Sequence, residues 1–308
     1  MFQISAYLNL SLAMIIVGSS VVFGKIITEA FPVFLASGLR FSIASLAMIP
    51  FLVRSRSRLM AIHHREYIKI MAMAVAGQFV FTFLLLLGLR YTSGIEAGII
   101  TSTSPAFMAV MSWVFFREKT SRRQFSGILL VITGMVVINV WPLLTRSTLS
   151  GFHIWGNLLI LGAVLGEAVF LLMRKQIDPD ISDMELTGLL CVAGLILFLP
   201  FSLWQAVSFD FTSVNADAWV SMAYFGAIFT VLAYLFWFKG VSRVSGNIAG
   251  AFTAIMPVSA TLLSTLFLDE SLTLASTIGG VMIIGSIFMM CLPSKREGAW
   301  KSEEQPAA

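Results

Sequence analysis

One pattern of small residues and proline occurs twice in this sequence, as GLRYTSGIEAGIITSTSPAF at Gly88–Phe107 and as GVSRVSGNIAGAFTAIMPV at Gly240–Val258. A shift of 152 residues without gaps places residues 88–127 over residues 240–279 and gives 11 identities in 40 positions. The identical residues include Gly, Pro and Glu, which chance similarity between two apolar stretches does not readily produce. We therefore interpret the chain as two copies of one unit.

The composition indicates a membrane protein. Of the 308 residues, 58% are hydrophobic and 12% are charged, whereas charged residues make up about 25% of soluble domains. So few charges could not cover the surface of a soluble protein of this size, which excludes a soluble enzyme, a nucleic-acid-binding domain and a disordered chain. Cys191 and Cys291 lie far apart in apolar stretches, and the three histidines lack the spacing of metal ligands. We therefore expect no disulfide framework, no metal and no cofactor.

Apolar runs of about 20 residues recur along the chain with short polar breaks between them. Each run is near the length that crosses a hydrocarbon core of about 30 Å at about 1.5 Å per residue, and in lipid a helix satisfies its own backbone. The sequence therefore predicts an all-α integral membrane protein with ten transmembrane helices. We place these helices at residues 6–27, 32–53, 67–89, 95–116, 124–144, 154–173, 186–207, 218–238, 247–268 and 272–292.

The positions of Lys and Arg predict how these helices are oriented. If the N-terminus is cytoplasmic, the inside loops and the C-terminal tail carry 16 Lys and Arg residues, and the outside loops carry three. We therefore expect a multi-pass protein with both termini in the cytoplasm. Residues 6–144 are expected to form the first five-helix repeat, residues 152–292 the second, and residues 293–308 a cytoplasmic tail.

Because each repeat has five helices, the second repeat is expected to enter the membrane from the opposite side. The loops agree: REKTSRR follows the fourth helix, whereas its equivalent after the ninth helix, DESLTLA, has no Lys or Arg. Inverted repeats are the usual architecture of secondary transporters, whose substrate site lies near the middle of the membrane between the repeats. Two nearly equivalent packings, one open to each side, would provide alternating access.

These motifs resemble the drug/metabolite transporter superfamily, specifically its ten-helix branch with two EamA-type repeats. The resemblance covers about residues 6–292. One departure is Val17, where many relatives carry Trp, so a substrate-stacking role is not carried over to this position. Besides the two stretches quoted above, the resemblance rests on GSSVVFGK at Gly18–Lys25, on Pro32 followed eight residues later by Arg40, on FFREKTSRRQFSG at 115–127 and on LFLDESLTLASTIGG at 266–280.

The resemblance implies a carrier in the plasma membrane, the inner membrane of a bacterium, that moves small metabolites or drugs. Export driven by proton exchange is frequent in this family, and uptake and facilitated exchange also occur. Our preferred hypothesis is a proton-coupled exporter of amino acids or related amphipathic compounds. The alternative is an uptake carrier or an uncoupled exchanger of the same fold. The implied partners are the lipid bilayer, a small-molecule substrate and protons, and a homodimer is left open.

Glu167 is the first candidate for the chemistry, because it lies near the middle of the sixth predicted helix. An ionised residue at a helix centre costs about 2.5–3.5 kcal/mol on insertion scales, so this carboxyl must face a cavity or a partner, or be protonated. It could couple transport to a proton or hold a substrate ammonium; the alternative is a hydrogen-bonded Glu that packs two helices. The spacing from Glu167 to Lys175 is also similar to an intramembrane Glu and a Lys eight residues later in the small multidrug-resistance branch.

Arg40 and Glu96 are further charged candidates. Arg40 lies about a third of the way along the second helix and could bind a substrate carboxylate or pair with Glu167. Because an Arg at this position is a family feature across different substrates, we favour a structural role, in which Arg40 caps carbonyls of a broken helix or extends outward. Glu96 opens the fourth helix, and its repeat equivalent is Ile248, so the fold does not require a carboxylate there.

Polar, aromatic and proline residues lie at similar depths in other helices. Gln78, Tyr234 and Trp237 are candidates for lining the substrate cavity, with hydrogen bonding between helices as the alternative. Pro105 and Pro257 occupy equivalent positions in the two repeats and are predicted to kink the fourth and ninth helices as hinges.

An integral-membrane enzyme is a remote alternative. It would need a cluster of His, Asp or Cys near one membrane interface, or a nucleophile with a base in reach, and the polar loops contain no such cluster. We interpret the acidic stretch formed by Asp178, Asp180, Asp183 and Glu185 as a solvated turn. We therefore expect no enzymatic activity.

Overall fold

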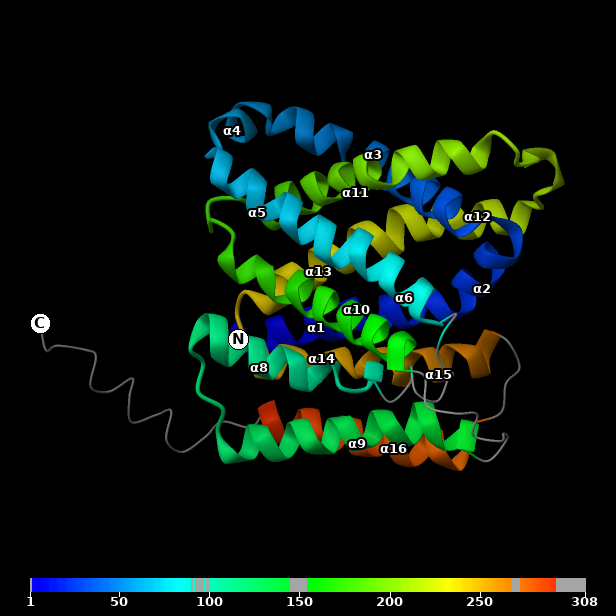
Figure 1. Cartoon of the computed structure of the whole chain (residues 1–308). Helices are drawn as coiled ribbons and strands as arrows, with labels where there is room; N and C mark the ends of the chain where they lie inside the picture. Colours follow the sequence, from blue (N-terminus) through cyan, green and yellow to red (C-terminus); the bar gives the residue numbers. More distant parts are fainter. Residues whose placement is uncertain are drawn as a thin grey trace, which may run out of the picture.

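The protein is a bundle of helices in the computed structural model (Figure 1), and the described residues contain no strand. This arrangement confirms the predicted fold class, since helices satisfy their backbone groups without water. The predicted tail at 293–308 and the candidate Glu96 lie outside the described residues. The structure describes residues 2–89, 91, 97, 100–144, 154–267 and 272–291.

The first repeat follows the predicted order of spans, with the short helix α4 (Arg56–Ala61) between the second and the third. Its spans are α1 (Phe2–Gly18) with α2 (Ser20–Ala30); α3 (Val33–Arg54); α5 (His64–Ala74) with η1 (Val75–Val80) and α6 (Phe81–Leu89); α8 (Ser104–Phe116); and α9 (Arg122–Leu144).

The second repeat has the same order, with the 3-10 turns η2 (Arg174–Gln176) and η3 (Phe211–Ser213) between its spans. Its spans are α10 (Ile154–Met173); α11 (Asp183–Ala206); α12 (Ala216–Tyr224) with η4 (Phe225–Leu232) and α13 (Ala233–Val241); α14 (Gly246–Thr253) with α15 (Ile255–Phe267); and α16 (Leu274–Cys291). Across the described residues, eight helical stretches are long and apolar enough to cross a membrane, and α8 is a shorter apolar helix. The 23 residues of α9 also suffice at about 1.5 Å per residue.

The shift of 152 residues relates the helices as well as the sequence motifs. It moves residues 33–54 of α3 onto residues 185–206 of α11, and the π-helix η1 onto residues 227–232, within the π-helix η4. Equivalent helices also pack against one another: α3 lies along α11, and α9 lies along α16 at one edge of the bundle (Figure 1). The two repeats therefore share this π-helical irregularity and meet around common helix pairs.

A second irregularity is shared by the fourth and ninth spans. The backbone leaves the helix at Ser102 and Thr103 before α8, and at Ala254 between α14 and α15. Each break begins three residues before the proline, Pro105 or Pro257. Proline lacks the N–H that would bond the carbonyl four residues back, so a break at this place follows from the sequence. The role of the two prolines as hinges stays a prediction.

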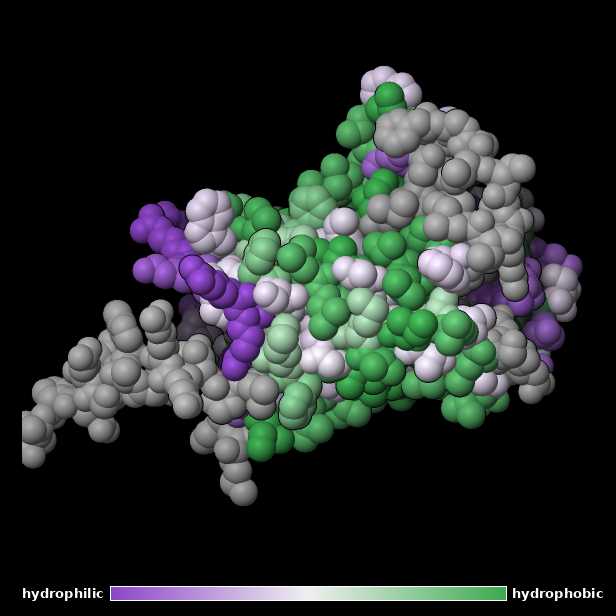
Figure 2. Space-filling view, turned by 90° about the horizontal axis from the view of Figure 1, so that it is seen from below, coloured by the Kyte–Doolittle hydropathy of each residue, from purple (hydrophilic) through white to green (hydrophobic). Residues whose placement is uncertain are grey.

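The basic loops gather at one end of the bundle. The N-terminus, α4 and the described loops after α8, α10 and α13 all lie on the left in Figure 1. Hydrophobic side chains cover the middle of the face shown in Figure 2, and hydrophilic side chains lie toward its ends. This distribution fits a membrane-spanning bundle. Which side of the membrane the basic end faces stays a prediction, as do the repeat boundaries at 6–144 and 152–292.

The contact between α9 and α16 depends on two glycines. A Cβ atom added to Gly279 of α16 would lie 2.6 Å from the carbonyl oxygen of Gly134 and 2.5 Å from Ile138 Cγ1, both in α9. By contrast, a Cβ atom at Gly285 of the same helix would meet nothing within 4 Å.

We expect Gly279→Ala to destabilise the protein by about 1–3 kcal/mol, because the added methyl group must push the backbones of α9 and α16 apart. The melting temperature in detergent should fall by several degrees. The matched change Gly285→Ala should leave it unchanged or raise it slightly, because alanine favours the helix. Equal melting temperatures for the two variants would contradict the close approach of the helices.

Candidate functional site

Two of the predicted site residues, Gln78 and Tyr234, form one polar cluster inside the bundle. The amide Nε2 of Gln78 donates to the carbonyl oxygen of Leu190 at 3.3 Å and to the hydroxyl of Tyr234 at 3.4 Å. Gln78 lies in η1 and is 3% exposed. Leu190 belongs to α11 and Tyr234 to α13, so the cluster joins both repeats. A π-helical turn is often found at functional sites, and here it carries Gln78.

Arg40 of α3 adds a positive charge to this cluster. Its guanidinium carbon lies 4.3 Å from the ring centroid of Phe41 and 5.7 Å from that of Phe229 in η4, distances typical of cation–π contacts. Tyr234 and Cys191 lie within electrostatic range of this charge. Within the described part of the chain, Arg40 donates no hydrogen bond and has no carboxylate within ion-pair distance, and its Nε is buried without a partner.

These contacts bear on the interpretations of Arg40. The possible ion pair with Glu167 is absent between these two described residues, and Arg40 caps no carbonyl of a described residue. Its role stays a prediction. Burying a charge without a partner is costly, so the two aromatic faces offset only part of that cost. Among the described residues, the Nε atom of Arg40 therefore has no acceptor.

A second buried polar atom of this cluster has no partner. Among the described residues, the Oε1 atom of Gln78 accepts no hydrogen bond. A Cβ atom added to Gly194 of α11 would lie 2.6 Å from Gln78 Oε1 and 2.5 Å from Phe41 Cε1, so only glycine leaves room for both side chains here. The cluster therefore offers an unpaired donor on Arg40 and an unpaired acceptor on Gln78.

Glu167 of α10 lies in a separate part of the site. Its Oε2 accepts a hydrogen bond from Ser104 Oγ at 3.2 Å. Ser104 is the first residue of α8, directly after the break in the fourth span, so this break aims its hydroxyl at the carboxyl group. Among the described residues, no cation lies within ion-pair distance of Glu167.

The Glu167 side of the site touches the polar cluster through apolar residues. A Cβ atom at Gly166 would lie 2.6 Å from the carbonyl oxygen of Ala76 in η1, so α10 approaches the π-helix closely beside Glu167. One turn further along α10, the ring of Phe170 lies 5.1 Å from that of Tyr234. The carboxyl group and the Arg40 cluster thus belong to neighbouring, directly packed helices.

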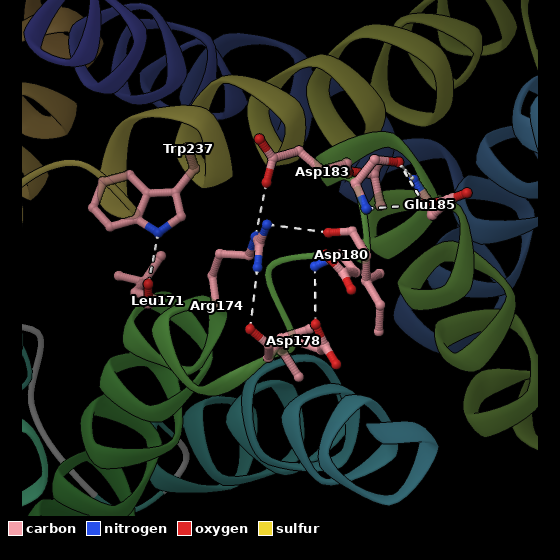
Figure 3. A network of polar contacts seen from close by, with 11 residues as sticks. Leu171, Arg174, Asp178, Asp180, Asp183, Glu185 and Trp237 are labelled. Atoms are coloured by element: carbon pink, nitrogen blue, oxygen red, sulfur yellow. Dashed lines mark hydrogen bonds and ion pairs between the residues drawn. The ribbon is translucent and has the colours of Figure 1, made fainter. Parts of the chain in front are cut away.

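Trp237 and Lys175 have partners other than Arg40, Gln78 and Glu167. Trp237 is 2% exposed, and its indole N–H donates to the carbonyl oxygen of Leu171 at 2.8 Å, so its polar atom already has a partner (Figure 3). Lys175, eight residues after Glu167, is paired with Glu118 at 2.6 Å instead. The similarity to the small multidrug-resistance motif therefore does not extend to a contact between Glu167 and Lys175.

The acidic stretch after the sixth span is not a solvated turn throughout, so that interpretation was wrong. Arg174, 8% exposed, donates from Nε to Asp183 at 2.7 Å and from its other nitrogens to the carbonyls of Ile177 and Ile181 (Figure 3). Glu185 is 5% exposed and forms a capping box with Ser182 at the start of α11. Only Asp178 and Asp180 of this stretch are exposed.

Three residues at the site were not among the sequence candidates: Ser104, Phe229 and Cys191. Ser104 directly precedes Pro105, which the repeat comparison singled out, so a signal for it exists in the sequence. Phe229 and Cys191 look like ordinary apolar residues of a transmembrane helix, and only the packing of η4 and α11 brings them to Arg40.

A helical bundle of inverted repeats around buried polar groups defines a multi-pass membrane transporter. The comparisons identify its family. Residues 4–140 and 154–292 each match the EamA-like transporter family, and the chain belongs to that family. It is 37% identical over 303 residues to the "Uncharacterized transporter YetK" of Bacillus subtilis (strain 168), which covers 98% of this chain and 92% of that protein.

More distant relatives agree. An "Uncharacterized transporter" of Archaeoglobus fulgidus is 26% identical over 262 residues, covering 84% of this chain and 88% of that protein. A solved crystal structure is 19% identical with a TM-score of 0.78, covering 96% of this chain and 99% of that one, which shows the same fold. The predicted membership of the drug/metabolite transporter superfamily is confirmed.

The hydrogen bond of Trp237 predicts a measurable contribution to stability. We expect Trp237→Phe to reduce the free energy of unfolding by about 1–3 kcal/mol and so to lower the melting temperature in detergent. The buried hydrogen bond to Leu171 is lost, and the smaller ring leaves a gap. The control is Trp204→Phe, since Trp204 is 72% exposed on the outside of the bundle. A loss of transport in Trp237→Phe at an unchanged melting temperature would instead place Trp237 in the substrate path.

Proposed function

We propose that this EamA-family transporter is a proton-coupled exporter of amino acids or related small amphipathic compounds. The observation that carries the proposal is Glu167, an intramembrane carboxyl group that accepts a hydrogen bond from Ser104, beside a break in the neighbouring helix. A carboxyl group without a fixed cation can alternate between a charged and a neutral form. Intramembrane ionisable residues of this kind mark proton relays and substrate sites.

In the proposed cycle, a proton that enters from outside neutralises Glu167, and substrate leaves outward. Reopening to the inside releases the proton and restores the charge, which Ser104 stabilises by donating a hydrogen bond. One charge that moves through ~150 mV is worth about 3.5 kcal/mol. At about 1.36 kcal/mol per decade, this energy supports a gradient of a few hundredfold.

The Arg40 cluster is the proposed binding site for the substrate's charged or polar end. A carboxylate there would accept from the unpaired Nε of Arg40 and reduce the cost of burying its charge. Tyr234 and Gln78 lie beside it and would complete the polar contacts. We also assign Pro105 and Pro257 as hinges and Glu96 as a further site candidate, and we place both termini, including residues 293–308, in the cytoplasm.

We expect Glu167→Gln to abolish proton-coupled transport, because the amide cannot exchange a proton. The measurement uses proteoliposomes with a pH-sensitive dye inside, challenged in turn with a panel of free amino acids. The wild-type protein should change the internal pH with at least one of them, and the variant with none. The control is Glu29→Gln, which changes an exposed carboxyl group at the end of α2. Unaltered proton movement in Glu167→Gln would remove Glu167 from the mechanism.

The same vesicles distinguish the proton-coupled exporter from the alternative, an uptake carrier or an uncoupled exchanger. Substrate flux that is independent of an imposed pH gradient, in wild type and Glu167→Gln alike, would favour an uncoupled exchanger. Flux that a gradient drives inward would favour uptake. An integral-membrane enzyme would convert the compound rather than move it, so recovery of unchanged substrate on the far side distinguishes the two.

Arg40 gives a second prediction. Arg40→Lys keeps the charge but loses the unpaired Nε and the planar group between the two rings, so we expect the half-saturating substrate concentration to rise about tenfold, which corresponds to about 1.4 kcal/mol. The variant should still fold, with a melting temperature close to that of the wild-type protein. Arg54→Lys, at the exposed end of the same helix, is the control. A lower melting temperature with unchanged saturation would assign Arg40 a structural role.

A further inference from the structure

A charged junction lies away from the polar cluster, at the end of the bundle where the basic loops gather. Its centre is Glu118, in the loop between α8 and α9. One carboxylate oxygen of Glu118 pairs with Lys175 Nζ at 2.6 Å. The other oxygen accepts the backbone N–H of Gly246 at 2.7 Å and the hydroxyl of Ser112. A single side chain thus connects α8, η2 and the start of α14.

The junction joins the two repeats. Glu118 and its loop belong to the first repeat, whereas Lys175 ends the sixth span and Gly246 begins the ninth. A neighbouring contact also joins the two repeats. Asn247 of α14 donates a hydrogen bond to Thr120 of the loop at 3.1 Å. The negative charge of Glu118 also lies at the N-terminus of α14, where the helix dipole favours it.

The ion pair is partly shielded from water. The side chain of Lys175 is 11% exposed and that of Glu118 is 23% exposed. Lys175 Nζ also lies 5.3 Å from the ring centroid of Phe116, within range of a cation–π contact. A pair in this setting is less screened by salt and solvent than an exposed ion pair.

The repeat symmetry shows what is special about this end. The shift of 152 residues relates Ser112, Glu118 and Gly246 to Ser264, Glu270 and Gly94, so the sequence provides a hydroxyl, a carboxylate and a glycine at both ends. The equivalent of Lys175 is Phe23. The comparison rests on the sequence, since Glu270 and Gly94 lie outside the described residues. At the position equivalent to Lys175, the sequence therefore has an aromatic residue instead of a cation.

We propose that the Glu118–Lys175 ion pair is a latch that holds the basic end of the transporter closed and so biases the protein toward the conformation open at the opposite end. The proposal rests on alternating access, the part of the proposed function in which the ends open in turn, and on neither the substrate nor the coupling proton. With equivalent contacts at both ends, the two conformations would be close in energy. The extra ion pair makes them unequal.

The test measures the separation of the loops across this end. Spin labels on Arg122→Cys, at the start of α9, and Arg243→Cys, in the loop before α14, report on the two repeats, in a protein whose Cys191 and Cys291 are replaced by alanine. The parent protein in lipid should show mainly one short distance between the labels. In Lys175→Met, the ratio of long to short distances should rise about tenfold.

Three further variants sharpen the test. Glu118→Gln keeps an acceptor for Gly246 but loses the charge, so it should shift the ratio in the same direction. The double variant Glu118→Gln with Lys175→Met should shift it no further than Lys175→Met alone, because both changes remove one interaction. Lys239→Met removes an exposed lysine at the same end and should leave the distances unchanged.

An unchanged distance distribution in Lys175→Met would overturn the latch, and so would an equal shift in Lys239→Met. A lower melting temperature in Lys175→Met and Glu118→Gln, without a population at longer distance, would also overturn it, because the junction would then be a structural cap. The measurement needs neither substrate nor a pH gradient. A failure of proton coupling at Glu167 therefore leaves this result unaffected, and a failed latch leaves the proton test intact.

Discussion

The membrane interior supplies no hydrogen-bond partners, and this constraint shapes the whole structure. Continuous helices satisfy most of the backbone, so each break needs local compensation. Thr101 and Thr253, equivalent residues just before the breaks in the fourth and ninth spans, donate from Oγ1 to the carbonyls of Ala97 at 2.9 Å and Gly250 at 2.6 Å. Two irregularities of the described backbone therefore occur at matched places in the two repeats, and one of them directs Ser104 to Glu167. The break at Ser19, between α1 and α2, has no counterpart in the continuous helix α10.

The same constraint makes charge scarce inside the bundle, and the protein treats its charges in two ways. Arg174 and Lys175, near one end, are paired with Asp183 and Glu118. Arg40 and Glu167 have no such partner in the described structure, although an ion pair between them would offset part of the cost of burying both. Under the proposed function, these two charges serve ligands that move, an anion at Arg40 and a proton at Glu167, rather than stability.

The sequence predicts much of this architecture, because long apolar runs, an internal repeat and isolated intramembrane charges are local signals. It does not predict the contacts. The π-helices η1 and η4 depend on how the third and eighth spans pack, and only that packing brings Gln78 to Tyr234 and Phe229 to Arg40. The acidic turn was misread for a similar reason, since Asp183 gains its partner when the chain folds back onto a buried Arg174. Spacing along one helix, as between Glu167 and Lys175, says little about partners on other helices.

The residues that break the repeat symmetry carry the proposed mechanism. Glu167 corresponds to Ile15, Gln78 to Thr230 and Lys175 to Phe23, so the shared scaffold supplies two related conformations and single-copy side chains make them different. These differences act on separate quantities. A latch changes how often each end is open, and hence the rate of transport, but it cannot change the final gradient. In the proposed mechanism, the gradient depends on the free energy of the coupled proton, so Glu167 would set the direction of transport and Glu118 its speed.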